Sequence, residues 1–135
     1  MTDPVVYVST WTIKDGKFDA YERFHRRLVE TVRDLEPRVP AFLAFVNDDA
    51  SEVTGIHVFP DAAALEHHMG VLAERMGVLA GDIGVVMDML APGHIHVYGA
   101  RPEQALAMDR PLEDSGVPFT ATTRFLGGFT RGRDE

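Results

Sequence analysis

The 135-residue chain contains no cysteine, and this absence removes several kinds of chemistry at once. Disulfide bonds, thiolate metal sites and a cysteine nucleophile are all excluded. The chain also has no excess of basic residues. Its 21 acidic residues outnumber its 13 lysines and arginines, which leaves a formal charge of −8. Nucleic acids and anionic membranes are bound through basic surfaces, so we expect neither as a partner.

The sequence also lacks any apolar run approaching the roughly 18 residues of a membrane span. Its first residues, Met-Thr-Asp-Pro, have neither the basic segment nor the apolar core of a secretory leader. We therefore expect a cytoplasmic protein. With 45% hydrophobic residues the chain can form one core. We expect a folded unit over residues 1–100 and an extension over 101–135 that packs on the same domain or on a partner subunit.

Four segments rich in β-branched and aromatic residues predict strands, and they span 5–13, 40–46, 52–59 and 94–98. Apolar residues at helical spacing predict a first helix over 16–36, with Asp15 as its cap and Pro37 as its end. Asp61 is the expected cap of a second helix.

The second helical segment carries a regular apolar stripe. It consists of Leu65, Met69, Leu72, Met76, Leu79, Ile83, Val86 and Leu90, a spacing that keeps one helix face apolar. A glycine recurs at every seventh position from Gly70, and each interior glycine costs roughly 1 kcal/mol of helix stability relative to alanine. We therefore predict a break between Gly77 and Asp82, with a shorter helix over 83–90.

The resulting order, β-α-β-β-α-β, predicts an α+β, ferredoxin-like fold with an antiparallel sheet and both helices on one face. The other face is too apolar to remain in water, so a second copy is expected to pack against it. In the extension we predict a helix over 102–108, a non-helical stretch through Gly116, an edge strand over 117–126 and fraying over 132–135.

Two segments resemble a known family. Trp11-Thr-Ile-Lys-Asp-Gly-Lys-Phe18 resembles the strand, Gly-Lys turn and helix start of the antibiotic biosynthesis monooxygenase type of dimeric α/β-barrel protein. Phe59-Pro-Asp-Ala-Ala-Ala-Leu-Glu-His-His-Met69 is similar to the family's strand-to-helix segment, where a histidine stands at the position of His68. The resemblance covers roughly residues 5–99 and leaves the extension outside it.

The resemblance implies a homodimer whose two sheets form a barrel, with a pocket between sheet and helices in each subunit. It implies a monooxygenase that needs no metal, flavin or other cofactor and acts on a small aromatic, polyketide-like molecule. The protein would supply a base, a dry pocket and hydrogen bonds for developing negative charge. The same fold also serves polyketide cyclases, isomerase-like enzymes and proteins without known activity, so a non-catalytic ligand-binding dimer stays open.

Histidines provide the candidate catalytic groups, because imidazole titrates near neutral pH. His68 is the first candidate for the base or hydrogen-bond donor, although a histidine at a helix start can equally face solvent. His57 lies in an otherwise apolar strand and either faces the pocket or is a satisfied interior residue. The remaining candidates would bind substrate, and they are Trp11, Tyr7, His67, His96 and Tyr98.

His94 and His96 share one strand face, a spacing at which two imidazoles can bind one metal ion. No spacing in the sequence supplies a clear third ligand, so we expect no metal site. Haem is also not expected. The haem-degrading members of the superfamily combine an asparagine on the first strand with a tryptophan and a histidine, whereas this chain has Ser9 there and its only tryptophan, Trp11, on the same strand.

Overall fold

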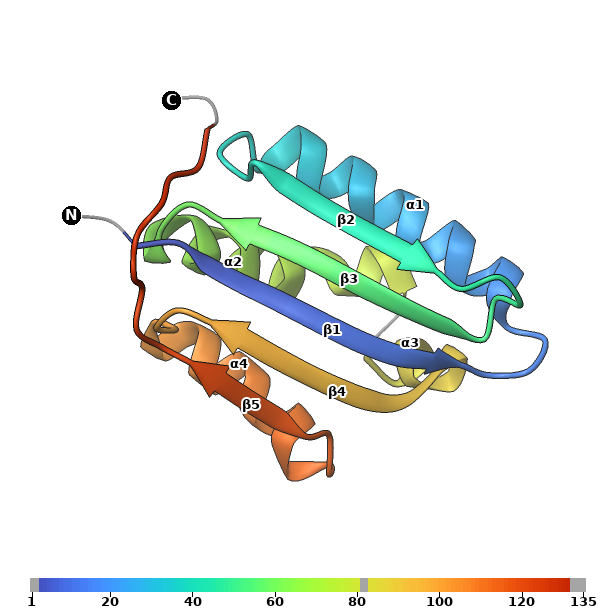
Figure 1. Cartoon of the computed structure of the whole chain (residues 1–135). Helices are drawn as coiled ribbons and strands as arrows, with labels where there is room; N and C mark the ends of the chain where they lie inside the picture. The colour runs from blue at the N-terminus through green and yellow to red at the C-terminus, as the bar shows by residue number, and fades with distance from the viewer. Residues whose placement is uncertain (1–2, 81–82, 132–135) are drawn as a thin grey trace.

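The computed structural model describes residues 3–80 and 83–131. Its elements are, in order, β1 (Val5–Ile13), α1 (Phe18–Leu35), β2 (Ala41–Val46), β3 (Glu52–Phe59), α2 (Ala62–Ala80), α3 (Ile83–Met89), β4 (Leu90–Tyr98), α4 (Glu103–Asp114) and β5 (Phe119–Thr122). Figure 1 shows the strands side by side in one sheet with the helices behind it.

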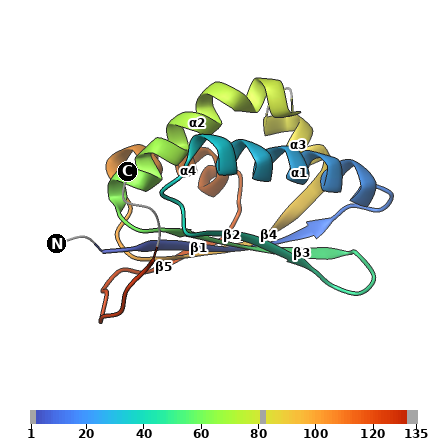
Figure 2. The same ribbon diagram turned by 90° about the horizontal axis from the view of Figure 1, so that it is seen from above.

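The sheet has the strand order β2-β3-β1-β4-β5. Its first four strands pair antiparallel, and β4 and β5 pair parallel. All four helices lie on one face of the sheet, as the view in Figure 2 shows. The predicted ferredoxin-like β-α-β-β-α-β arrangement is therefore confirmed for the first four strands and the helices that join them.

Most predicted elements agree with the structure within a few residues, but the cap of the first helix does not. α1 follows Lys17, which makes no side-chain capping hydrogen bond, so the prediction of Asp15 as the cap is wrong. Gly16 has a positive φ of 76° and turns the chain before the helix begins. Asp61 does cap α2, because its Oδ1 accepts a hydrogen bond from the Ala64 N–H at 2.8 Å.

The long helical segment is divided as predicted. α2 ends at Ala80 and α3 begins at Ile83, and residues 81–82, the end of the predicted break, lie outside the described part. β4 begins at Leu90 instead of His94, because Leu90 and Ala91 pair with β1 beyond a register shift between Thr10 and Thr12. Sequence reasoning missed this because Pro92 and Gly93 were interpreted as a stop.

The extension folds back onto its own subunit. α4 continues to Asp114 through Pro111, so the prediction that the helix ends at 108 is wrong. Leu112 packs against the core beyond the proline, which explains why the helix persists. β5 spans only 119–122 at the edge of the sheet, a shorter strand than the predicted one. The predicted fraying over 132–135 lies outside the described residues.

The core lies between the sheet and the helices. The largest fully buried side chains are Phe59, Leu65, Val5 and Val97. Val117 and Ala105 join the same cluster, so the extension contributes to the core of its own subunit. Within the described residues, no helix is both long enough and apolar enough to cross a membrane.

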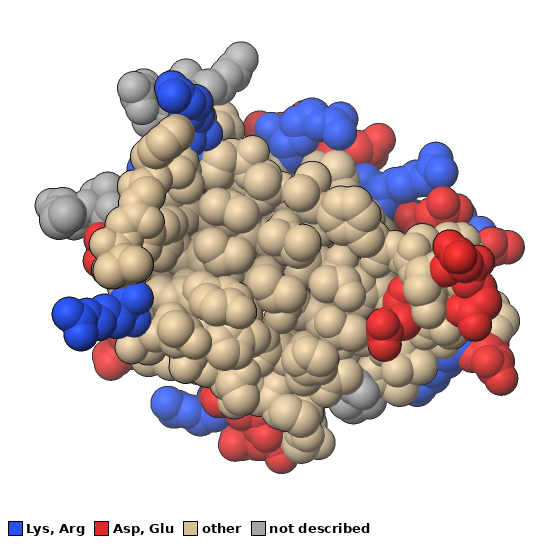
Figure 3. Space-filling model, viewed as in Figure 1, with Lys and Arg blue, Asp and Glu red and all other residues tan. Residues whose placement is uncertain are grey.

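No described helix covers the sheet face turned away from α1–α4 (Figure 2). Alternation along the strands places apolar side chains on it: Val6, Val8, Leu43, Phe45, Ile56 and Val58. Figure 3 shows this face almost free of Lys, Arg, Asp and Glu, which gather at its rim. We call it the open face.

Candidate functional site

A buried carboxylate lies where α1 ends and α2 passes. Pro37 ends α1, and Glu36 closes the helix with its N–H donating to the carbonyl of Val32 at 2.8 Å. The side chain of Glu36 is only 1% exposed. It therefore needs a polar partner inside the protein.

His68 is that partner. It lies on the inward face of α2 next to Met69, in the same stripe as Leu65, and is 5% exposed. Its Nδ1 lies 2.9 Å from both carboxylate oxygens of Glu36. Because Nδ1 faces the carboxylate, Nε2 is the ring nitrogen of His68 that is left for another partner. His68 is therefore buried and does not face solvent, and its catalytic role stays a prediction; sequence reasoning missed Glu36.

His57 lies on the helix-facing side of β3 and stacks on Phe42, with ring centroids 3.8 Å apart and planes 12° apart. Gly55 makes room for it, because a Cβ there would lie 3.2 Å from His57 Nε2. Burial, strengthened by the nearby imidazoles of His68 and His25, lowers the pKa of His57 from 6.5 to about 3. His57 is therefore neutral at physiological pH and makes no side-chain hydrogen bond to a described residue.

His25 approaches the same region from α1. Burial lowers its pKa, and its Nδ1 is buried without a hydrogen-bond partner among the described residues. Its ring stacks beside Tyr21 with centroids 5.9 Å apart. Sequence reasoning did not single out His25, because its helical spacing matched an ordinary apolar stripe.

Aromatic rings surround the imidazoles of the site. Phe42 lies 5.7 Å and Phe59 lies 4.9 Å from His68, measured between ring centroids. Three helix or strand elements thus bring His25, His57 and His68 together beside an apolar wall. We call this group, with Glu36, the histidine cluster. It combines one carboxylate-supported imidazole with a neutral one, an arrangement suited to moving a proton in a dry environment.

Tyr7 and Trp11 both lie on the helix-facing side of β1, as their shared spacing predicts. The Tyr7 hydroxyl donates to Asp109 Oδ2 at 2.7 Å, and Arg101 donates to the same oxygen at 2.9 Å. Burial and the Asp109 carboxylate raise the pKa of Tyr7. Tyr7 therefore anchors α4 to the sheet. Its substrate-binding role, like that of Trp11, stays a prediction.

The other predicted site residues lie elsewhere. His96 and Tyr98 lie on the open face, where His96 contacts the hydroxyls of Thr120 and Thr122 at 2.5 and 2.9 Å. His94 is exposed on the same face. The sheet thus separates these residues from the histidine cluster. No group of three or more His, Asp or Glu side chains within the described residues is arranged to hold a metal ion.

A cavity of about 190 Å³ lies between the end of α1 and the first turn of α2. Its lining is Glu36, Pro37, Arg38, Val39, Ala63, Ala64 and His67. The Nε2 of His67 donates to the carbonyl of Leu35 at 2.8 Å. Glu36 lines this cavity and also contacts His68, which does not line it.

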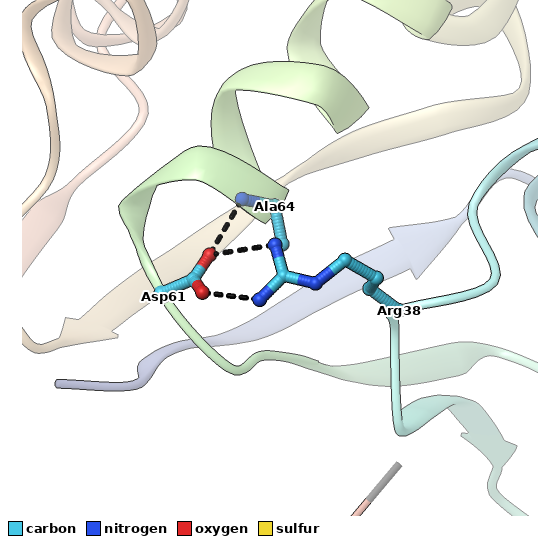
Figure 4. A network of polar contacts seen from close by, with 3 residues as sticks. All are labelled: Arg38, Asp61 and Ala64. Carbon is cyan, nitrogen blue, oxygen red and sulfur yellow. Dashed lines mark hydrogen bonds and ion pairs between the residues drawn. The ribbon is translucent and has the colours of Figure 1, made fainter. Parts of the chain in front are cut away.

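Arg38, which lines the cavity, forms an ion pair with Asp61 (Figure 4). The Asp61 carboxylate accepts hydrogen bonds from both terminal nitrogens of Arg38, and it also caps α2. The hydrogen bond from Arg38 lowers the pKa of Asp61, so the carboxylate remains charged. This pair fixes the turn that carries Glu36 against the helix that carries His68.

No family model matches the sequence, and no curated protein matches it either. Solved structures do match its fold. MupZ from Pseudomonas fluorescens aligns with a TM-score of 0.65 and 16% identity over 95% of this chain and 91% of its own. SnoaB from Streptomyces nogalater, a cofactor-independent oxygenase, gives 0.55 and 17% over 74% and 95%. An antibiotic biosynthesis monooxygenase gives 0.54 and 22% over 73% and 99%.

These similarities establish the fold and confirm, at that level, the resemblance found in the sequence. The chain has the α+β architecture of the antibiotic biosynthesis monooxygenase structures. The alignment with MupZ extends over nearly the whole chain, whereas the other two cover about three quarters of it.

Proposed function

We propose that the protein is a cofactor-independent monooxygenase acting on a small aromatic, polyketide-like substrate. The observation that carries the proposal is the buried Glu36–His68 pair beside a neutral His57 in aromatic surroundings. An imidazole supported by a carboxylate is a stronger base than an isolated one, because the carboxylate stabilises the imidazolium that forms. The oxygenase activity of SnoaB, which shares the fold, adds support.

The reaction begins when His68 Nε2 takes an acidic proton from a phenol or from the CH₂ group of an anthrone-like ring. The resulting anion transfers an electron to O₂, and recombination of the two radicals forms a carbon–oxygen bond. Loss of water then gives the ketone, so that CH₂ and O₂ become C=O and H₂O. In this mechanism His57, which is neutral and makes no side-chain hydrogen bond to a described residue, donates a hydrogen bond to the substrate oxygen.

Oxygen consumption tests this function. Metal-free protein should consume O₂ with an anthrone or hydroquinone, and His68→Gln and Glu36→Gln should lower kcat by about 10²- to 10⁴-fold, the usual contribution of a general base. Glu66→Gln is the matched control, because it changes an exposed residue of α2 outside the histidine cluster and the cavity, and it should leave kcat within a few-fold. Absence of oxygen consumption with every such substrate would refute the proposal.

A cyclase is the related alternative, because the same base can generate a carbanion that closes a ring without O₂. It predicts turnover that is unchanged under anaerobic conditions and still depends on His68.

A non-catalytic ligand-binding protein is the second candidate, and the position of the cavity favours it. The cavity beside Glu36 is lined by neither His57 nor His68. A ligand held there would meet Pro37, Val39, His67 and two alanines of α2 instead of the imidazoles of the histidine cluster. This alternative predicts a co-purifying small molecule, detectable by native mass spectrometry, whose affinity does not change in His68→Gln.

We also propose that the protein is a homodimer that buries the open face. This face is apolar and nearly uncharged in a chain whose formal charge is −8, so a second copy can approach it without strong repulsion. Light scattering should give twice the mass of one chain. Introducing a charge by Ile56→Lys should shift the protein toward monomer.

A further inference from the structure

One buried polar atom of the histidine cluster has no part in the proposed reaction. It is Nδ1 of His25, which is buried and has no hydrogen-bond partner among the described residues. Most buried polar atoms in proteins are hydrogen-bonded, and leaving one unpaired lowers stability. The position of this atom is explained if a bound ligand supplies the missing partner.

His25 reaches the interior from the inner face of α1. Tyr21 precedes it by one helical turn and Leu28 follows it by one turn, and both pack against the core cluster that includes Val53 of β3. The imidazole stacks beside the ring of Tyr21, with centroids 5.9 Å apart. The charge of His25 also contributes to the lowered pKa of His57, so the two imidazoles lie near each other.

A row of small residues crosses the helix-facing side of the sheet next to His57. It consists of Ala44 on β2, Gly55 on β3 and Ser9 on β1, which lie opposite one another in the strand pairing. The Nε2 of His57 lies over this row, because a Cβ at Gly55 would be only 3.2 Å from it. A planar ring can approach the sheet more closely over such small residues than over the larger residues of the neighbouring rows.

The ligand group that suits His25 is a hydroxyl. Burial lowers the pKa of His25, so its imidazole is neutral and offers no charge to a carboxylate or a phosphate. In a neutral imidazole Nδ1 is a donor in one tautomer and an acceptor in the other. A hydroxyl both donates and accepts, so it can pair with either tautomer.

We infer that His25 is a specificity residue of the proposed enzyme, and that its Nδ1 hydrogen-bonds a hydroxyl of the aromatic substrate next to the oxygen that His57 contacts. The inference rests on the proposed function and narrows the substrate class to rings with two neighbouring oxygen substituents, such as a dihydroxyanthrone. In that molecule a phenolic hydroxyl lies beside the ring carbonyl, so His25 and His57 can each bind one oxygen. The CH₂ group on the opposite side of the ring is left for His68. A substrate that lacks the hydroxyl leaves Nδ1 of His25 unpaired, so the enzyme discriminates against it.

Two substrates and two substitutions test this role. Dihydroxyanthrone and anthrone differ only in the ring hydroxyls, so the ratio of their kcat/KM values measures recognition of those hydroxyls. Asparagine and leucine have the same branched shape, but only asparagine keeps a hydrogen-bonding atom near the position of Nδ1. His25→Leu should lower the ratio about 10-fold, the usual contribution of one hydrogen bond, whereas His25→Asn should keep it within about 3-fold. Glu66→Gln, an exposed change on α2, is the control and should not alter the ratio.

Equilibrium binding separates failure of this inference from failure of the proposed function. Dihydroxyanthraquinone and anthraquinone have the same ring system without the reactive CH₂ group, and quenching of Trp11, the only tryptophan, measures their Kd values. If the ratio of Kd values shifts in His25→Leu but the natural protein consumes no oxygen, the oxygenase is overturned and the role of His25 stands. If neither quinone binds and no oxygen is consumed, both proposals are wrong.

The remaining outcomes concern His25 alone. Oxygen consumption with an unchanged ratio in His25→Leu overturns the role of His25 and leaves the oxygenase intact, since a water molecule bound at Nδ1 would then explain the buried atom. An equal change of the ratio in His25→Leu and His25→Asn also overturns it, because packing alone would produce that result. Circular dichroism checks that the variants are folded. If His25→Leu does not fold, His25→Gln replaces it, because glutamine moves the amide away from the position of Nδ1.

Discussion

Acidification should destabilise the protein through His57. The folded protein holds the pKa of His57 at about 3, whereas the unfolded chain keeps it near 6.5. Below the unfolded value the unfolded state binds more protons, so the free energy of unfolding falls as the pH falls from 6.5 towards 3. His57 alone should account for a loss of about 2 kcal/mol between about pH 7 and about pH 5. His25, whose pKa is lowered by burial, changes stability in the same direction.

Urea unfolding followed by circular dichroism across this pH range measures the loss. In His57→Gln the free energy of unfolding should depend less on pH, even if the variant is less stable than the natural protein at neutral pH. His67→Gln is the control, because that side chain is exposed on α2 and lies away from the open face, and it should keep the full dependence of stability on pH. If His57→Gln loses stability on acidification as steeply as the natural protein, the neutral, buried state assigned to His57 is wrong.

Further substitutions test the packing around the site. Gly93→Ala should cost at least about 3 kcal/mol or prevent folding, because the new Cβ would lie 1.8 Å from the carbonyl oxygen of Thr10. Gly70→Ala, at a helical position with nothing within 4 Å, should instead raise stability by up to about 1 kcal/mol, and thermal unfolding of the pair distinguishes these outcomes. Asp61→Ala should lower stability by about 1–2 kcal/mol through loss of the helix cap. Asp61→Asn should keep most of this stability, because asparagine can also cap a helix. Tyr7→Phe should cost about 1–2 kcal/mol, since it leaves a buried carboxylate on α4 short of one hydrogen bond, and denaturant unfolding that detects no loss would contradict this role.

The fold was largely predictable because it depends on local periodicity. β1 was predicted over 5–13 and occupies those residues, and the glycine-led repeat correctly indicated a division of the second helical layer. These features follow from hydrophobic periodicity, because apolar side chains recur every two residues in a strand and every three to four residues in a helix. The two main errors, the start of β4 and the length of α4, occur at prolines, where packing against the sheet overrides local preference.

The candidate site was only partly predictable. His57 and His68 were recognised from their residue type and their position near a strand-to-helix turn. Glu36 was missed because a glutamate at the end of a helix is usually solvated, and only the tertiary fold places it against α2. His96 and Tyr98 were grouped with the site because their strand face could not be assigned before the sheet order was known.

Glu36 both ends α1 and contacts His68, so the integrity of the last helical turn and the geometry of the Glu36–His68 pair depend on the same residue. The residue before a proline is restricted to extended backbone conformations, and Glu36, which precedes Pro37, has φ −131° and ψ 68°. The backbone thus aims the carboxylate, while the hydrogen bond from its N–H to Val32 belongs to the last turn of α1. Fraying of that turn would disconnect Glu36 from His68. The amide-exchange rate of Glu36 therefore reports how often this helical turn opens, and hydrogen exchange can follow the integrity of the Glu36–His68 contact without any substrate.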